Sequence, residues 1–361
     1  MGLNPNGNEL LNRARTDLRA GLAVVLVRDG RAALIFATET LTADRLVLAR
    51  TLGAPVLAIT KRRCQTLKLQ AHDGDLARIS LAKDADIDWV FSISDPVYDQ
   101  KTAPKGPLHA VRNGNADLHR GAIKLVKSAL LLPAAIVIEI SNGAAFAQHH
   151  NLSLIDLNIV KDTAEISPLS KIISASLPLG AARAAKLHVF RSENGAEEHC
   201  AIQIGQPDLD AAVLVRLHSA CFTGDLLGSL KCDCGAQLND SLKQMGGQGS
   251  GVLLYLNQEG RGIGLANKMR AYSLQNQGFD TVQANHRLGF EDDERDFRIG
   301  ANILKIMGIS NVHLLTNNPA KVNMLIAEGI NVSKRVPLLV GHSCDNKNYL
   351  KTKAEKSGHI L

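Results

Sequence analysis

Short apolar runs alternate with amphipathic stretches along the first part of the chain. Apolar residues fill 22–27, 33–36 and 56–59, and a stretch with helical periodicity covers 43–52. Apolar runs of about four to eight residues are typical of buried strands, and helical patterns between them are typical of sheets covered by helices. This alternation predicts an α/β arrangement.

The same alternation continues to residue 140. An apolar run occupies 89–93, residues 95–107 have loop composition, and a helical pattern over 117–132 stops at Pro133. Residues 134–140 have the composition of a fully buried strand. The first part of the chain therefore contains enough apolar segments for one complete sheet.

The pattern breaks between residues 161 and 180, where prolines and a glycine interrupt it. Beyond the break a second set of strands is predicted, at 186–191, 199–204, 212–217, 252–256 and 312–315. A chain of 361 residues exceeds what one hydrophobic core usually serves. We therefore expect two domains, 1–170 and 171–361, of α/β (α+β) class, each a mixed sheet with packed helices.

The composition limits the kinds of binding partner that we expect. The formal charge of +6 favours anionic partners in general, but aromatic residues are only 4% and no basic run with interleaved aromatics is present. We therefore expect no nucleic-acid partner. No apolar run reaches the 18 residues or so of a membrane span, and the N-terminus does not resemble a signal peptide, so we expect a cytoplasmic protein without a membrane partner.

Three of the six cysteines, Cys221, Cys232 and Cys234, fall close together. Such clustering in a cytoplasmic chain indicates metal binding or catalysis rather than disulfides. Three thiolates leave one corner of a tetrahedral zinc site open for water, and zinc lowers the pKa of that water to about 7. Two alternatives remain: ordinary core cysteines, or a structural site completed by His218 or Cys200.

A glycine-rich turn at 258–264 follows the strand predicted at 252–256 and precedes a helical pattern at 265–275. Such a turn directs backbone N–H groups toward an anion, although many turns of this kind bind nothing. Its spacing matches neither the dinucleotide fingerprint nor the P-loop.

Two further segments contain residues suited to phosphate chemistry. The acidic run 291–298 opens a predicted amphipathic helix, in which Arg295 suits phosphoryl binding and Asp293 suits proton acceptance. Most of these carboxylates would only compensate the helix dipole. At 316–321, Thr316 and Lys321 make a second phosphate contact plausible, with a plain Asn-Pro helix start as the alternative.

Taken together, these segments resemble GTP cyclohydrolase II, the first enzyme of riboflavin synthesis, over residues 172–361. The resemblance is carried by ordered matches at 216–225, 232–237, 258–261, 284–286, 293–297 and 316–321. It implies hydrolysis of GTP, with zinc-activated water opening the imidazole ring to release formate. It also implies loss of pyrophosphate with Mg²⁺, the product 2,5-diamino-6-(5-phosphoribosylamino)pyrimidin-4(3H)-one, and a homodimer.

The resemblance also assigns roles to residues. Cys221, Cys232 and Cys234 would hold zinc, and Arg295, Asp293 and Tyr272 would be catalytic: Arg295 at the α-phosphorus, as nucleophile or stabiliser, and Asp293 as proton acceptor. The GTP contacts would be Arg216, Leu217, His218, Ser219, Ala220, Gln237, Glu259, Gly260, Arg261, Thr281, Thr316 and Lys321. The family usually has Glu where this chain has Ala220.

The first 170 residues faintly resemble 3,4-dihydroxy-2-butanone-4-phosphate synthase, through the segments 107–109, 115–119 and 136–140. The acidic metal-binding motif of that family, D-x-E-x-E-x-D, is replaced here by Asp29-Gly-Arg31-Ala-Ala-Leu. Hard cations need several oxygen ligands. We therefore expect this domain to be non-catalytic and to serve in dimerisation or regulation.

Three other functions remain in view. The chain could be a catalytically impaired GTP-binding regulatory protein, an idea motivated by Ala220, or a related cyclohydrolase with a different product. A zinc deaminase of nucleobases is disfavoured, because its H-x-E and P-C-x-x-C pattern is missing.

Overall fold

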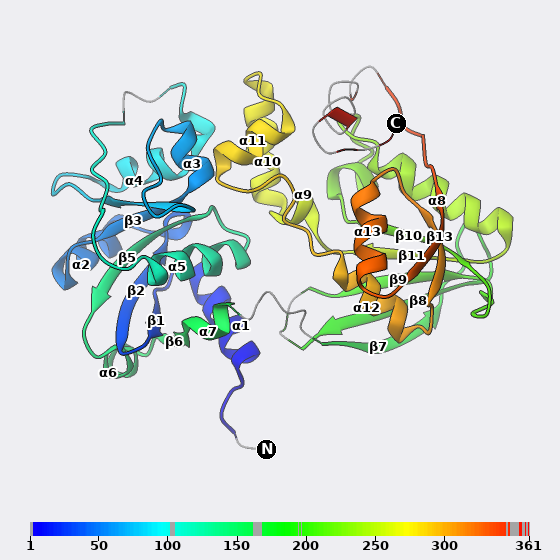
Figure 1. Cartoon of the computed structure of the whole chain (residues 1–361), viewed down its shortest axis with the longest axis horizontal. Helices are drawn as coiled ribbons and strands as arrows, with labels where there is room; N and C mark the ends of the chain where they lie inside the picture. The colour runs from blue at the N-terminus through cyan, green and yellow to red at the C-terminus, as the bar shows by residue number, and fades with distance from the viewer. Residues whose placement is uncertain are drawn as a thin grey trace. The chain divides into compact units, whose positions relative to one another are not determined.

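The computed structural model of the protein describes residues 3–101, 105–161, 168–193, 195, 197–343, 346, 354–355, 358 and 360. The chain forms two compact units (Figure 1). The first unit comprises Met1–Glu165 and Ala266–Asp293, and the second comprises Ile166–Leu265 and Glu294–Leu361. Each unit is built on its own sheet and is described by itself below.

A six-stranded mixed sheet forms the centre of the first unit, in the order β4-β3-β5-β2-β1-β6. Only β1 and β6 run parallel to each other, and the remaining pairs are antiparallel. The strands are β1 (Val24–Arg28), β2 (Arg31–Ala37), β3 (Val56–Thr60), β4 (Leu76–Ser80), β5 (Ala134–Ile140) and β6 (Ser153–Asp156).

Helices cover both faces of this sheet. One apolar core lies under α1 (Gly7–Arg19), α5 (Asp117–Ser128) and α7 (Leu157–Lys161). The other core lies under α2 (Ala43–Leu52), α3 (Lys61–Thr66), α4 (Ile87–Ser94) and α6 (Gly143–His150). The unit also contains α10 (Leu265–Asn276) and α11 (Thr281–Leu288), and α11 packs against α3.

A two-residue turn joins β1 to β2. Asp29 and Gly30 both have positive φ, of 49° and 76°, and Arg28 pairs with Arg31 across the hairpin. Asp-Gly is a preferred sequence for such turns, because both central residues must adopt a left-handed backbone. The segment where the synthase family has its acidic motif is therefore a tight hairpin here.

A seven-stranded mixed sheet forms the centre of the second unit, in the order β13-β12-β10-β11-β9-β8-β7. Strand β10 lies between β12 and β11 and is parallel to both, β13 is parallel to β12, and the other pairs are antiparallel. The strands are β7 (Leu169–Ser176), β8 (Ala185–Ser192), β9 (His199–Ile204), β10 (Val213–Ser219), β11 (Gly251–Leu256), β12 (Asn311–Leu315) and β13 (Asn331–Val336).

The helical elements of the second unit are the single turn η4 (Phe222–Leu226), α8 (Cys234–Gln248), α9 (Glu259–Gly262), α12 (Arg298–Ile306) and α13 (Pro319–Ala327). The helix that the acidic run 291–298 is expected to open begins at the last residue of the run, Arg298. The side chain of Asp296 accepts hydrogen bonds from the backbone N–H and the guanidinium of Arg298, and the acidic residues before it lie in a loop.

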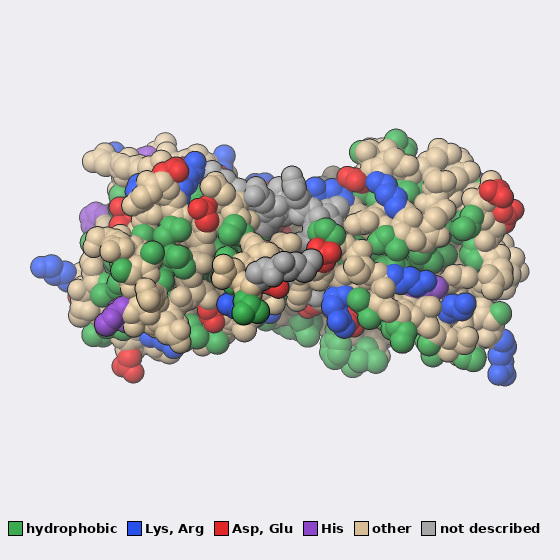
Figure 2. Space-filling model, turned by 90° about the horizontal axis from the view of Figure 1, so that it is seen from below, with side chains coloured by type: hydrophobic (Ala, Val, Ile, Leu, Met, Phe, Trp, Pro, Cys, Tyr) green, Lys and Arg blue, Asp and Glu red, His purple; other side chains and the backbone are tan. Residues whose placement is uncertain are grey.

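Two mixed sheets with packed helices confirm the predicted fold class. The segment Ala266–Asp293 belongs to the first unit, although it lies in the second half of the chain. The domain boundary expected near residue 170 stays a prediction, and residues 162–167 beside it lie outside the described residues. Within the described chain, every helix is too short or too polar to cross a bilayer. On the face seen in Figure 2, basic and acidic side chains are scattered rather than gathered by sign.

Candidate active site

The candidate residues of the second unit gather at the carboxyl ends of three parallel strands. Strand β10 leads into Ser219, Ala220 and Cys221, β11 leads into the turn at 258–264, and β12 leads into Thr316. Because these strands are neighbours and parallel, their carboxyl ends share one edge of the sheet. Ligands of open α/β sheets bind at this edge.

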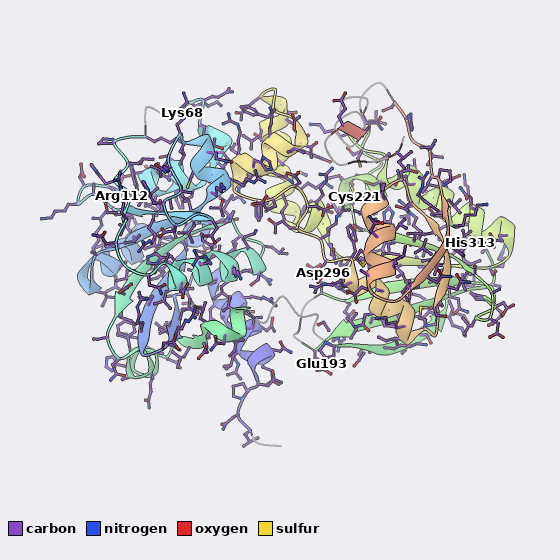
Figure 3. The ribbon with its side chains drawn as sticks, in the orientation of Figure 1. Lys68, Arg112, Glu193, Cys221, Asp296 and His313 are labelled. Atoms are coloured by element: carbon purple, nitrogen blue, oxygen red, sulfur yellow. The ribbon has the colours of Figure 1, made fainter. Side chains whose placement is uncertain are left out.

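The sulfur atoms of Cys221, Cys232 and Cys234 form one cluster there. All three lie within 4.8 Å of one another, and the Sγ atoms of Cys221 and Cys232 are 3.7 Å apart. Cys221, labelled in Figure 3, is buried, and the other two are partly buried. Among the described residues, neither His218 nor Cys200 joins this group. The arrangement fits a metal ion held by three protein sulfurs, with no fourth ligand among the described side chains.

Local backbone structure produces this cluster. Cys221 caps the turn η4, and its Sγ accepts a hydrogen bond from the backbone N–H of Gly224 at 3.4 Å. A β-carbon at Gly224 would lie 2.8 Å from the Sγ of Cys232 and 3.1 Å from the Sγ of Cys221, so only glycine fits. Cys234 begins α8, and the positive end of a helix dipole stabilises a thiolate.

The contact with Cys221 opposes ionisation of Cys232. The pKa of the Cys232 thiol is raised to about 11, chiefly by its hydrogen bond with Cys221. Thiolates packed this closely need a cation to offset their mutual repulsion. The donor set is thus suited to a thiol-binding metal ion.

Asp225 connects the sulfur cluster to its surroundings. Its carboxylate accepts hydrogen bonds from the backbone N–H of Cys221 at 2.9 Å, from the hydroxyl of Tyr255 at 2.9 Å and from Nε2 of His218 at 3.0 Å. The rings of His218 and Tyr255 stack with centroids 5.6 Å apart. This network fixes the position of the first cysteine.

Buried His218 is held neutral by its environment. Burial lowers the pKa of its imidazole most strongly, although the hydrogen bond with Asp225 opposes this effect. Its Nδ1 has no hydrogen-bond partner among the described residues. A buried nitrogen without a partner is available to a ligand.

Arg216 provides a buried positive charge at the same edge. The residue is 6% exposed, and burial lowers the pKa of its guanidinium to about 10. It donates to Oε1 of Gln237 at 2.6 Å and to the carbonyl of Leu315 at 3.3 Å. Its Nε has no hydrogen-bond partner in the described part of the chain. A buried guanidinium with one nitrogen still lacking a hydrogen-bond partner is suited to bind an anionic ligand.

Lys321 and Thr316 complete the side of the site next to β12. The Nζ of Lys321 donates to the carbonyl of Leu217 at 2.8 Å and lies 4.8 Å from the centre of the Phe297 ring. The hydroxyl of Thr316 accepts from the backbone N–H of Asn318, which caps α13. The helix N-terminus and the lysine place positive charge beside the strand end.

The glycine-rich turn has an unusual backbone. Gly260, Arg261 and Gly262 all have positive φ, of 64°, 62° and 87°. The carbonyl of Arg261 accepts from the N–H of Glu294 at 2.9 Å, so this turn packs against the loop that contains Arg295. The carboxylate of Glu259 accepts from the N–H of Phe222 at 2.6 Å, which connects the turn to the cysteine loop.

Arg295 lies beside the end of β10. Its Nη1 donates to the hydroxyl of Ser219 at 3.2 Å, and its guanidinium lies 4.7 Å from the centre of the Phe297 ring. The structure therefore brings Arg295 to the strand end that leads into the cysteine cluster. Ala220 lies at this end too, and its N–H donates to the carbonyl of Leu256.

The remaining predicted residues, Tyr272, Thr281 and Asp293, belong to the first unit. Tyr272 lies on α10, where the Nζ of Lys268 is 5.6 Å from its ring centre. Thr281 begins α11, and its hydroxyl accepts from Gln275 at 3.2 Å. Asp293 is exposed.

Sequence reasoning missed Asp225 and Tyr255 as site residues. Asp225 follows Cys221 by four residues within the cysteine loop, a position that offered a signal. Tyr255 offered none, because an aromatic residue within a strand usually belongs to the core.

Comparisons with known proteins identify the family of the chain. The sequence profile of GTP cyclohydrolase II matches residues 170–337. A GTP cyclohydrolase-2 of Azospirillum brasilense is 40% identical over 97% of this chain and 94% of its own length. A GTP cyclohydrolase-2 of Xylella fastidiosa strain 9a5c is 38% identical over 97% of this chain and 86% of its own.

Other matches cover less of the sequence or are more distant. A GTP cyclohydrolase-2 of Shigella boydii is 56% identical over 45% of this chain and 84% of its own length. Among solved structures, a two-domain 3,4-dihydroxy-2-butanone 4-phosphate synthase from A. baumannii covers 85% of this chain and 93% of its own, at 18% identity and a TM-score of 0.32. The relatives that match along almost the whole chain decide the family: the chain belongs to the GTP cyclohydrolase II family.

Proposed function

We propose that this protein hydrolyses GTP, opening the imidazole ring and releasing formate and pyrophosphate in the first step of riboflavin synthesis. The observation that carries the proposal is the three-sulfur cluster at the sheet edge where the buried cation Arg216 also lies. The product we propose is 2,5-diamino-6-(5-phosphoribosylamino)pyrimidin-4(3H)-one. The family membership and these residues together favour a nucleotide triphosphate as the substrate.

Zinc is the metal we assign to Cys221, Cys232 and Cys234. Tetrahedral ligands at about 2.3 Å from zinc lie about 3.8 Å apart, and the 3.7 Å between two of the sulfurs supports this assignment. When bound, zinc supplies Lewis acidity that activates water near neutral pH. Free thiols of this kind persist in the reducing cytoplasm, where we place the reaction.

The chain's own residues would hold the nucleotide. We propose that Arg216, Lys321 and the α13 N-terminus beside Thr316 bind the triphosphate, since charge-assisted hydrogen bonds to phosphate are strong. The neutral His218 would offer its unpaired Nδ1 to a polar group of the substrate. The remaining contacts we propose are Leu217, Ser219, Ala220, Gln237, Glu259, Gly260, Arg261 and Thr281.

Pyrophosphate release calls for a second group of residues. We propose that Arg295 donates to the α-phosphoryl group as its bond to pyrophosphate breaks, with Mg²⁺ bound to the departing phosphates. Asp293 would accept a proton, and Tyr272 would complete the catalytic set. The contact between Arg295 and Ser219 supports this role, because it holds the guanidinium at the end of β10.

Residues 1–170 have no catalytic function in this proposal. Two arginines flank the β1–β2 turn: Arg28 pairs with Asp117 at 2.7 Å, and Arg31 pairs with Glu139 at 2.6 Å. Those carboxylates are already engaged by cations, which supports the view that they do not bind a metal ion. We assign residues 1–170 to dimerisation or regulation, within a homodimer.

A GTP-binding regulatory protein is the second candidate, favoured by Ala220 in place of the usual Glu. One assay separates the two. The purified full chain is incubated with GTP, Zn²⁺ and Mg²⁺, and formate, pyrophosphate and the mass of the organic product are measured.

Hydrolysis predicts all three products from the wild-type protein. Cys232→Ser should lose most of the bound zinc and lower turnover about a thousandfold or more, whereas Cys200→Ser should change neither. GTP binding without products, together with turnover gained in Ala220→Glu, would instead establish the regulatory protein.

A further inference from the structure

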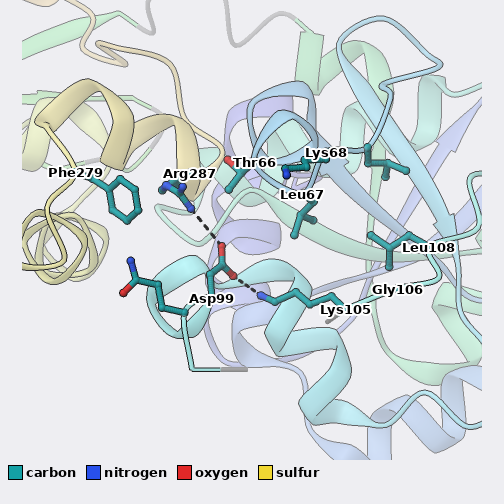
Figure 4. A pocket seen from close by; sticks show the side chains of 11 residues that line it. Thr66, Leu67, Lys68, Asp99, Lys105, Gly106, Leu108, Phe279 and Arg287 are labelled. Atoms are coloured by element: carbon teal, nitrogen blue, oxygen red, sulfur yellow. Dashed lines mark hydrogen bonds and ion pairs between the residues drawn. The ribbon is translucent and has the colours of Figure 1, made fainter. Parts of the chain in front are cut away.

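A pocket in the first unit lies among residues to which the proposed reaction gives no role. Its volume is about 580 Å³, within the range of small-molecule sites. Its walls are supplied by the end of α3 and the loop after it, by residues 99–100, by Lys105, Gly106 and Leu108, and by α11 with Phe279 before it (Figure 4). Every lining residue belongs to the first unit.

Positive charge dominates this pocket. Lys68, Lys105 and Arg287 line it, and Asp99 is the single carboxylate among the lining residues. Asp99 is already engaged by the buried Arg63, which donates to both of its oxygens at 2.6 and 2.9 Å. Lys105 also donates to Asp99. Asp99 therefore pairs with more than one cation, and its single negative charge does not balance the positive charges that line the pocket.

Arg287 is the cation that this carboxylate satisfies least. Its Nη1 is 3.8 Å from Asp99, beyond hydrogen-bond distance, and its guanidinium lies 3.8 Å from the centre of the Phe279 ring. Burial is the largest influence on the pKa values of Arg287 and Lys105, and it lowers both. Partly buried cations of this kind are stabilised by an anion in the pocket.

Apolar side chains complete the walls. Leu67 and Leu108 line the pocket across from Phe279 and Arg287, as Figure 4 shows. An inorganic anion would fill only part of 580 Å³ and would leave these leucines uncovered. A ligand with a charged end and an organic body fits both kinds of wall.

We propose that this pocket binds a small organic phosphate, with the phosphate between Lys68, Lys105 and Arg287 and the organic part against Leu67 and Leu108. The site is separate from the sulfur cluster, which belongs to the second unit. The proposal does not depend on GTP hydrolysis, because binding is measured without GTP.

The experiment is calorimetric titration of the full chain with phenyl phosphate, inorganic phosphate and phenol. We expect saturable binding of one phenyl phosphate per chain, weaker binding of inorganic phosphate and none of phenol. Lys105→Gln and Arg287→Gln should each weaken phenyl phosphate binding about tenfold, since each removes a charge-assisted contact. Lys68→Gln should also weaken it, and this exposed residue can be changed without disturbing the fold.

Two control variants locate the site. Lys83→Gln removes an exposed cation outside the pocket, and Lys321→Gln removes one from the candidate GTP site; both should bind phenyl phosphate as the wild type does. No saturable binding at millimolar concentration would overturn the proposal. So would equal affinity for inorganic phosphate, or a loss of binding in Lys321→Gln but not in Lys68→Gln.

Discussion

Gly224 shows how one missing side chain can determine a metal site. Its hydrogen atom faces two sulfurs, and any β-carbon there would lie within about 3 Å of them. We expect Gly224→Ala to push the sulfurs apart and lower zinc affinity at least about tenfold, because donor distances tolerate only a few tenths of an ångström. Zinc per chain, measured after dialysis against a weak chelator, checks this.

Gly247→Ala is the matched control for that substitution. Gly247 lies on α8, the helix that Cys234 begins, and nothing lies within 4 Å of an added β-carbon. Alanine there should retain zinc and stabilise the helix by about 0.5–1 kcal/mol. Equal zinc retention in the two variants would show that the close approach at Gly224 does not govern the metal site.

His199 makes the second unit sensitive to acid. Burial lowers the pKa of its imidazole to about 4, and its Nδ1 accepts a hydrogen bond from the N–H of Asn257. In the unfolded chain the pKa is about 6.5. As the pH falls, the unfolded state therefore binds the proton first. The stability that the neutral imidazole of His199 contributes is complete above pH about 6.5 and is lost toward pH about 4.

Between pH about 6.5 and about 4, the free energy of unfolding should fall by about 1.4 kcal/mol per pH unit. His199→Asn keeps an acceptor near the position of Nδ1 but does not titrate. We expect its unfolding free energy, from denaturant titration at pH 7 and pH 5, to fall less than that of the wild type. Exposed His72→Gln should behave like the wild type. Equal losses in wild type and His199→Asn would contradict the assignment.

The turn after β11 is the element whose backbone the candidate site depends on most. Gly262 has φ of 87°, and a β-carbon there would lie 2.7 Å from the carbonyl oxygen of Glu294. Gly262→Ala must therefore displace either the turn or the loop that contains Arg295. We expect formate release from GTP to fall about tenfold or more, while the zinc content stays at the wild-type value.

Gly228→Ala separates displacement from backbone strain. Gly228 also has a positive φ, of 63°, but its missing β-carbon faces open space. Alanine there should cost about 1–2 kcal/mol of stability and leave formate release unchanged. If both variants lost activity equally, strain alone would explain the effect and the packing of the turn on Glu294 would be irrelevant.

Elements with strong apolar patterns were predictable from the sequence. The bounds of β5 and β9 agree with the prediction, because short apolar runs mark strands, and the bounds of α2 agree as well. Strand β7 was missed, because most of its residues are exposed and no alternation marks it. The helix after the acidic run was predictable but its first residue was not, because α12 begins only at Arg298, whose backbone N–H donates to the side chain of Asp296.

The candidate site was predictable where its residues follow strand ends. Parallel neighbours bring such residues together even when they are far apart in sequence, as with Cys221 and Thr316. The hydrogen bonds of Asp225 were not predictable, because they depend on the packing of Tyr255 and His218. The roles of the individual site residues stay predictions until the variants are measured.

At the scale of the whole molecule, one segment belongs to a different unit from the residues before and after it in the sequence. Ala266–Asp293 belongs to the first unit through specific contacts: Thr60 donates to the carbonyl of Gly289 at 2.8 Å, and Arg62 pairs with Glu291 at 2.6 Å. Phe290 is fully buried, and Lys127 lies over its ring. The same segment contains three of the proposed site residues. Residues 1–165, to which we assign no catalytic role, would therefore still be needed to hold this segment.

The last prediction concerns the homodimer, for which exposed apolar residues of the second unit offer a contact surface in addition to residues 1–170. Phe222, Leu226, Leu227 and Leu230 are 45%, 71%, 64% and 63% exposed within nine residues of chain. Apolar groups this dense on a surface usually mark an interface. We expect sedimentation equilibrium to give the mass of two chains, and Leu226→Glu with Leu227→Glu to weaken the dimer about a hundredfold or more, because burying each leucine contributes about 2 kcal/mol. Ile326→Glu, at an exposed residue of α13, should leave the dimer intact. A monomeric wild-type protein, or a double variant that dimerises as tightly as the wild type, would rule out this surface.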